Sequence, residues 1–230
     1  MEQSVPNNKS SANVASWRTL NAAMLSFALT LFWVFMACEP PQNQHGSQSR
    51  PSAAARAHLE NGLRFLGSND YDRAIQELSS AIALAPNYMM AYNLRGQGHL
   101  DNNDFDSAIA DFSEAIKLGG KDAMTYWHII FNRGSAHLDK QDFDSAITDF
   151  TEVIKLAPKE FKSYGLVSRG NAYWLKKDYG AAISDFTSAI ELNPKEATFY
   201  YQRGQAHRGN GDQAKADADF EKAKQLGLGQ

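Results

Sequence analysis

The sequence contains a single cysteine, Cys38, in 230 residues, so no disulfide can form within the chain. It also lacks an excess of basic residues: 23 lysines and arginines stand against 26 aspartates and glutamates, a net charge of −3. Proteins that bind nucleic acid usually carry a basic stripe, so the composition argues against that class of partner. The sequence has no phosphate-binding loop, nucleophile elbow or zinc signature, which argues against the enzymes that depend on those motifs.

What the sequence does contain is a motif repeated five times. Each copy has a glycine, an aspartate eight residues later, an alanine twelve residues later and a large apolar residue sixteen residues later. The glycines are Gly62, Gly96, Gly134, Gly170 and Gly204. The large apolar residues are Leu78, Phe112, Phe150, Phe186 and Phe220. Self-similarity at this period is the signature of a repeat architecture, in which each copy is one supersecondary unit.

Each position of the motif has a physical role. The small residues allow two helices to approach closely, and the large apolar side chain fills the space beside them. The aspartate suits a helix N-cap, because its carboxylate can accept hydrogen bonds from the exposed amides of the first turn. Three copies then end in a proline, which stops a helix. We therefore expect five helix pairs, with helices at 53–66, 70–84, 88–101, 104–118, 122–139, 142–156, 160–176, 178–192, 196–209 and 212–226.

This pattern resembles the tetratricopeptide repeat family from Ala53 to Leu226. The resemblance implies an all-α fold, a right-handed superhelical solenoid of five helix-turn-helix units whose first helices line a concave groove. The solenoid is assigned to residues 53–230, with units at 55–88, 89–122, 123–160, 161–196 and 197–228.

The glycines are spaced 34, 38, 36 and 34 residues apart, whereas the family's period is about 34 residues. Four extra residues make about one helical turn, so we expect the first helix of the third unit to be longer. Two extra residues would rotate a helix out of phase, so we place those of the fourth unit in a loop. The second unit has Gly120 where three others have proline.

Two further positions change together between the copies. An arginine precedes the glycine in four units, at Arg95, Arg133, Arg169 and Arg203. In the same four units an aspartate precedes the large apolar residue, at Asp111, Asp149, Asp185 and Asp219. The first unit has Asn61 and Glu77 instead. We predict an ion pair within a unit or between neighbouring units; the alternative is that both side chains are separately solvated.

Three histidines recur three residues after their glycines, at His99, His137 and His207. The other two units have Phe65 and Tyr173 there, which indicates a packing role. One histidine per unit is too widely spaced to share a metal ion. We therefore predict no metal, no cofactor and no catalytic residues; a metal-dependent enzyme is kept only as a remote alternative.

The family resemblance indicates which side chains face the groove. Amides there could hydrogen-bond a peptide backbone, and aromatic rings could form apolar pockets. The candidates are Asn93, Gln97, Phe131, Ser135, Tyr164, Asn171, Trp174, Tyr201 and Gln205. The alternative for each aromatic ring is packing against the neighbouring helix. Co-chaperone members of the family hold a carboxylate with basic residues at two defined groove positions, and this chain has no lysine or arginine at either.

The N-terminal part has a different character. Residues 22–37 form a run of sixteen residues without a charge, shorter than the roughly 20 residues of a membrane-spanning helix. The run ends in Phe35-Met36-Ala37-Cys38, which resembles a bacterial lipoprotein signal. That resemblance implies lipidation of Cys38 and a location in the bacterial cell envelope, facing the periplasm or the exterior. The alternatives are an uncleaved single-pass anchor and a cleaved signal. Residues 1–37 are assigned to this signal or anchor.

Residues 38–52 are rich in proline, glutamine and serine, and we expect a flexible tether there. Together these features predict a membrane-tethered scaffold that binds a protein or an extended peptide, with no small-molecule substrate evident. The alternative is a structural subunit that self-associates through its last helix. No further helix caps that one, and its outer face carries Lys215, Lys222, Lys224 and Gln225. We expect it to fray or to be covered by a partner.

Overall fold

The computed structural model describes residues 51–119 and 123–228. Cys38, the apolar run 22–37 and Gly120 lie outside the described residues. Within the described ranges all regular structure is helical, and every helix begins and ends within two residues of its expected bounds. The α-helices are α2 (Ala53–Gly67), α3 (Tyr71–Leu84), α4 (Met89–Asp101), α5 (Phe105–Leu118), α6 (Ala123–Asp139), α7 (Phe143–Leu156), α8 (Lys162–Leu175), α9 (Tyr179–Leu192), α10 (Ala197–Gly209) and α11 (Gln213–Gln225).

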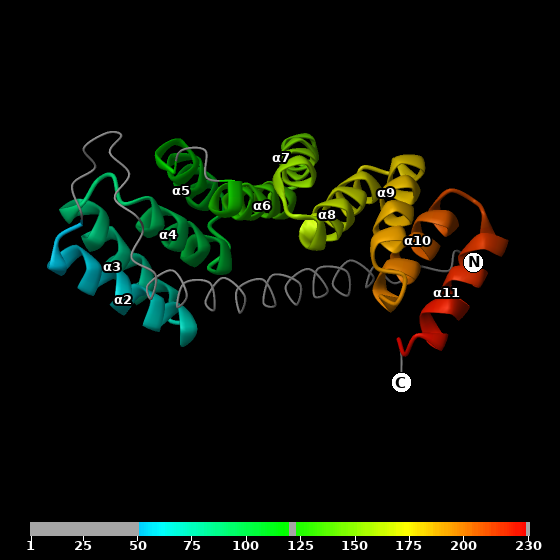
Figure 1. Ribbon diagram of the computed structural model, residues 1–230, viewed down its shortest axis with the longest axis horizontal. Helices are drawn as coiled ribbons and strands as arrows, with labels where there is room; N and C mark the ends of the chain where they lie inside the picture. Colours follow the sequence, from blue (N-terminus) through cyan, green and yellow to red (C-terminus); the bar gives the residue numbers. More distant parts are fainter. Residues whose placement is uncertain (1–50, 120–122, 229–230) are drawn as a thin grey trace, which may run out of the picture. The chain divides into compact units, whose positions relative to one another are not determined.

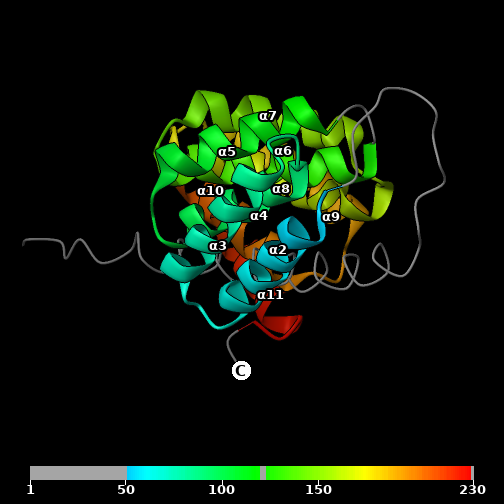
Figure 2. The same ribbon diagram turned by 90° about the vertical axis from the view of Figure 1, so that its left-hand side faces the viewer.

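The helices form five pairs that follow one another in chain order (Figures 1 and 2). Each first helix packs against the second helix of its own unit, and from α4 onward also against that of the preceding unit. Consecutive first helices also contact one another, from α2 to α10, whereas no two second helices are in contact in the described parts of the chain. Neighbouring units therefore lie closer together on the side of their first helices than on the side of their second helices. These helices, α2, α4, α6, α8 and α10, line the concave face that we call the groove.

The small and large residues of the motif meet as expected. A Cβ atom added at Gly134 would lie 2.9 Å from the Phe150 ring, and one added at Gly96 would lie 2.9 Å from Phe112. Both rings are completely buried. Only glycine allows the two helices of a unit to come this close, because every other residue would force its Cβ into the ring.

The turn between the two helices of a unit is the same in all five units. The amide of the capping aspartate donates to a carbonyl five residues earlier, for example Asp142 N to His137 O at 2.8 Å. This bond is the signature of a Schellman motif. The residue before the aspartate has a positive φ, 66° at Gln141 and 86° at Gly211.

The predicted N-caps form in four units. The carboxylates of Asp70, Asp104, Asp142 and Asp178 accept from the backbone amide three residues later. The prediction is wrong for Asp212, which occupies the N-cap position of α11 without a side-chain cap hydrogen bond. Its carboxylate lies instead 3.4 Å from Lys215 Nζ on the surface.

The two irregular spacings are absorbed as expected. Helix α6 has 17 residues, against 13 in α4, so the extra turn of the third unit is helical. The extra residues of the fourth unit form a short 3-10 turn, η1 (Lys159–Phe161), before α8 begins. The rings of Trp127 and Phe161 stack there with centroids 5.2 Å apart. This ring contact joins the start of α8 to α6, just after the extra turn of that helix.

We predict that Gly134→Ala lowers the free energy of unfolding by about 1–3 kcal/mol, because the new Cβ would overlap the Phe150 ring. Gly180→Ala is the matched control: the nearest atom to its added Cβ is 3.9 Å away. We expect that change to stabilise the protein by about 0.5 kcal/mol, since it removes backbone entropy from the unfolded chain. Urea denaturation followed by circular dichroism measures both; equal effects of the two changes would contradict the packing argument.

Candidate functional site

The groove is held in place by an ion pair within each of four units. In the third unit Arg133 Nε donates to Asp149 Oδ2 at 2.9 Å, and its Nη2 donates to Asp149 Oδ1 at 2.7 Å. The same two-bond geometry joins Arg95 to Asp111, Arg169 to Asp185 and Arg203 to Asp219. The predicted pairing is therefore present, and it lies within the unit.

Each of these arginines also reaches the preceding unit. The remaining guanidinium nitrogen, Nη1, donates to a hydroxyl on the preceding second helix: Ser113 at 3.3 Å from Arg133, and Thr151 at 3.0 Å from Arg169. Hydrogen bonds to Asp149 raise the pKa of Arg133, and burial opposes this rise. One side chain thus fixes three helices, which sets the spacing of the groove-lining helices.

The first unit has no preceding unit and no arginine at this position. Glu77 accepts from Asn61 Nδ2 at 3.3 Å and lies 2.8 Å from His58 Nδ1. The hydrogen bond from His58 lowers the pKa of Glu77. In the first unit, Asn61 and Glu77 therefore replace the arginine–aspartate ion pair of the other units with a different pairing.

We predict that Asp149→Asn lowers the free energy of unfolding by about 3 kcal/mol, because it leaves the partly buried Arg133 without its counter-charge. Asp144→Asn is the control, since Asp144 is exposed on the same helix. An exposed ion pair contributes about 1 kcal/mol or less. Denaturant titration of both variants tests the prediction, and a loss at Asp149 no larger than that at Asp144 would refute it.

Three of the predicted groove residues are buried. The exposed fractions are 5% for Gln97, 4% for Phe131 and 6% for Ser135. Phe131 packs on Phe150 with ring centroids 5.5 Å apart, and Ser135 Oγ donates to the Phe131 carbonyl at 3.0 Å. Like Gln97, Phe131 and Ser135 therefore add little accessible surface to the groove. Both lie on α6, which has packed neighbours on both sides.

The other candidates remain accessible. Asn93, Tyr164, Asn171, Trp174 and Gln205 are partly exposed. Among the large hydrophobic residues of the described chain, Tyr201 is exposed to 39% and Leu175 to 38%. Leu175, the last residue of α8, was not predicted as a binding residue. It lies five residues after Gly170, which is one of the two places where co-chaperone members of the family have a basic groove residue, and that place could have indicated it. The accessible apolar surface of the groove therefore lies on the fourth and fifth units.

Hydrogen bonds organise the groove side of these two units. Gln202 Nε2 donates to Asn171 Oδ1 at 3.3 Å, which joins α10 to α8. Gln205 Nε2 donates to the Tyr201 hydroxyl at 2.9 Å, and Arg208 donates to the Gln205 side-chain oxygen. The Tyr201 ring rests on Phe220 with centroids 5.5 Å apart. These contacts hold Tyr201 in a defined orientation on the exposed face.

Several buried polar atoms of the groove helices have no hydrogen-bond partner among the described residues. Asn93 Oδ1, an acceptor, and Gln97 Nε2, a donor, lie one turn apart on α4. Trp174 Nε1, a donor on α8, and Gln202 Oε1, an acceptor on α10, are likewise buried without a hydrogen-bond partner. An unpaired buried polar atom costs about 1–3 kcal/mol, and because these atoms are inaccessible to solvent, a ligand would reach them only if the side chains moved.

The three recurring histidines each face the turn of their own unit. His99, His137 and His207 lie 3.2, 3.3 and 3.7 Å from the capping aspartate there. The part of the chain that the structure describes contains no group of three or more potential metal ligands. No helix in that part is long and apolar enough to cross a membrane.

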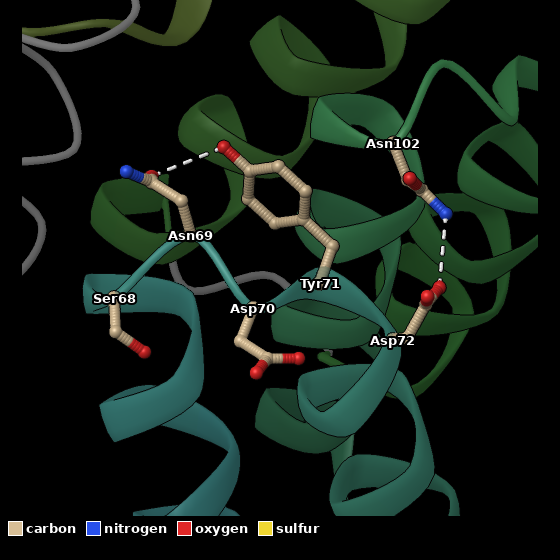
Figure 3. Close-up of a pocket in the computed structure, with 6 residues that line it drawn as sticks. All are labelled: Ser68, Asn69, Asp70, Tyr71, Asp72 and Asn102. Carbon is tan, nitrogen blue, oxygen red and sulfur yellow. Dashed lines mark hydrogen bonds between the residues drawn. The ribbon is translucent and has the colours of Figure 1, made fainter.

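A shallow depression of about 310 Å³ lies at the turn between α2 and α3. Figure 3 shows its lining of Ser68, Asn69, Asp70, Tyr71, Asp72 and Asn102. The Tyr71 hydroxyl donates to Asn69 Oδ1 at 3.1 Å, and Asn102 donates to Asp72 at 3.4 Å. Its polar groups are thus bonded to one another, and the groove remains the better candidate.

Comparison with known proteins agrees with this architecture. A family described as "Tetratricopeptide repeat" matches residues 59–123 and 131–186. Two related descriptions, "TPR repeat" and "Tetratricopeptide repeat", match residues 170–211 and 197–226. The chain belongs to the tetratricopeptide repeat family. A comparison with curated protein sequences finds no match.

Solved structures with the same fold include MamA and YrrB. A MamA crystal structure has a TM-score of 0.67 at 21% identity, covering 75% of this chain and 91% of its own. MamA from Desulfovibrio magneticus has a TM-score of 0.70 at 18% identity, covering 77% and 97%. YrrB, described as a TPR protein with an unusual peptide-binding site, has a TM-score of 0.63 at 16% identity, covering 78% and 95%. At these identities the likeness concerns the fold.

Proposed function

We propose that this protein is a membrane-tethered scaffold whose groove binds an extended segment of a partner protein. The observation that carries the proposal is the accessible surface of α8 and α10, where Trp174, Leu175 and Tyr201 are exposed or partly exposed. The partly exposed amides of Asn171 and Gln205 lie on the same two helices, and amides of this kind can pair with the one donor and one acceptor that each residue of an extended peptide offers.

The fourth and fifth units supply the side-chain contacts. Trp174, Leu175 and Tyr201 present apolar surface on the groove side, and large rigid residues of this kind commonly dominate binding energy. The absence of a basic clamp favours a partner segment that is neutral or apolar. YrrB, which has the same fold and is described as having an unusual peptide-binding site, is consistent with this class of ligand.

We propose further that the chain is attached to the bacterial envelope through a lipid on Cys38. The support is the sequence alone: an uncharged run that ends at Ala37-Cys38, followed by a polar stretch. An attached acyl chain contributes about 0.8 kcal/mol of membrane affinity per buried methylene. Mass spectrometry of the mature N-terminus tests this point: a lipid-modified peptide that begins at Cys38 is expected, and an unmodified peptide beginning at Met1 would refute it.

The binding proposal is tested with a displayed library of random 12-residue peptides, selected against the full chain. We expect enrichment of peptides with apolar residues. Their affinity should fall by about tenfold or more in the Trp174→Ala and Tyr201→Ala variants, because each loses a large contact surface. Isothermal titration calorimetry with one selected peptide measures the change.

Leu84→Ala is the matched control, because Leu84 is also an exposed large hydrophobic residue but lies on a second helix, α3. Its affinity for the selected peptide should equal that of the unchanged protein. Selected peptides that lose affinity only with Leu84→Ala would place the binding surface outside the groove and overturn the proposal.

A further inference from the structure

Neighbouring units meet through the same positions at each of the four internal junctions. A first helix offers a small residue two places after its glycine, at Gly98, Ala136, Ala172 and Ala206. The preceding second helix offers isoleucines thirteen and twenty places after its glycine, namely Ile75, Ile109, Ile147 and Ile183, and Ile82, Ile116, Ile154 and Ile190. A Cβ added at Gly98 would lie 3.3 Å from Ile75, and one added at Gly165 would lie 2.9 Å from Ile154.

The seryl and threonyl hydroxyls that accept from the arginines form the third element of this junction. They stand seventeen places after the glycine, at Ser79, Ser113, Thr151 and Thr187. A second helix that can receive another unit therefore carries isoleucine, hydroxyl and isoleucine at three defined positions. A first helix that can receive a preceding unit carries a small residue and an arginine.

The two ends of the array break this pattern at these same positions. On the last second helix, α11, the three places hold Asp217, Glu221 and Lys224, and all three side chains are exposed. On the first helix, α2, the small residue is replaced by Arg64, which is exposed, and the arginine is replaced by Asn61. Arg64 donates to Asn61 Oδ1 at 3.2 Å, so the two substitutions interact.

The C-terminal end of the last helix, α11, is closed by backbone hydrogen bonds. Gly227 has φ of 101°. Leu228 N donates to Ala223 O at 3.1 Å, and Gly227 N donates to Lys224 O at 3.0 Å. This bond pair is a Schellman motif, which satisfies the last carbonyl groups of a helix. The end of α11 is therefore closed by its own backbone, at the helix that we expected to fray or to be covered by a partner.

We propose that both end faces are closed to stacking, so that the array has a fixed length of five units. Stacking another unit on α11 would bury Asp217, Glu221 and Lys224 where the internal junctions bury isoleucine and a bonded hydroxyl. Burying charges without matched partners is unfavourable. Repeat arrays require such polar outer faces to remain soluble. This inference counts against self-association through the last helix.

The internal junctions supply the test, because they specify which residues would open each end. One variant opens the C-terminal face: Asp217→Ile, Glu221→Thr and Lys224→Ile. A second variant opens the N-terminal face: Asn61→Arg and Arg64→Ala. Both are made in the full chain and studied by sedimentation equilibrium in a detergent that is matched to the density of the solvent, so that the protein mass alone is measured.

We expect the unchanged chain and each variant alone to sediment as monomers, and a 1:1 mixture of the two variants to sediment at twice the monomer mass. A chain carrying all five substitutions should form longer head-to-tail polymers, since heterologous contacts that do not close make open arrays. The mixture should associate at a concentration at which neither variant associates by itself.

A control variant adds the same residues at three places that are exposed in every unit, ten, fourteen and twenty-one after the glycine: Ala214→Ile, Ala218→Thr and Gln225→Ile. Its mixture with the N-terminal variant should remain monomeric. The proposal is overturned if the unchanged chain forms end-to-end assemblies that Arg64→Glu disrupts. It is also overturned if the control mixture dimerises equally, or if the two opened variants are folded by circular dichroism and still do not associate.

Discussion

The whole array depends on one close approach, which is repeated in every unit. The glycine of a first helix lies against the large apolar residue of its partner helix, so near that an added Cβ at Gly96 would stand 2.9 Å from Phe112 and 3.2 Å from the Cβ of Asp111. Because arginine precedes the glycine and aspartate precedes the aromatic ring, this contact also brings Arg95 within 2.7 Å of Asp111. Packing and charge pairing therefore follow from the same geometry.

The charge pair then carries order from one unit to the next. Two nitrogens of each guanidinium are held by the aspartate of the same unit, which fixes the direction of the third nitrogen, Nη1. This nitrogen donates a hydrogen bond to a hydroxyl of the preceding unit. First helices touch along the row and second helices do not, so the units splay on the outer side and close on the inner side. A groove with polar atoms left unpaired is the result. A fixed number of units, bounded by charged end faces, would give that groove a fixed length.

The helix positions and the ion pairs were predictable from the amino-acid sequence. The glycine-to-aspartate spacing placed every helix, and the joint change of Asn61 with Glu77 predicted the pairing at Arg133 and Asp149. Burial depth was not predictable in the same way. Phe131 has a groove-facing place in its unit, yet it is buried, as is Val167 at the same place in the next unit. A repeat position gives the direction of a side chain, whereas its depth depends on the size of the residues around it. Asp212 fails as a cap because the same sequence position does not fix a side-chain rotamer.

The most direct test of the account is a backbone amide NMR titration of the full chain with a peptide selected for binding. Chemical-shift changes are predicted on the groove helices α4, α8 and α10, centred on Asn93, Asn171, Trp174 and Tyr201. Shift changes confined to the second helices, or to the exposed faces of α2 and α11, would contradict the claim that the first helices form the binding surface.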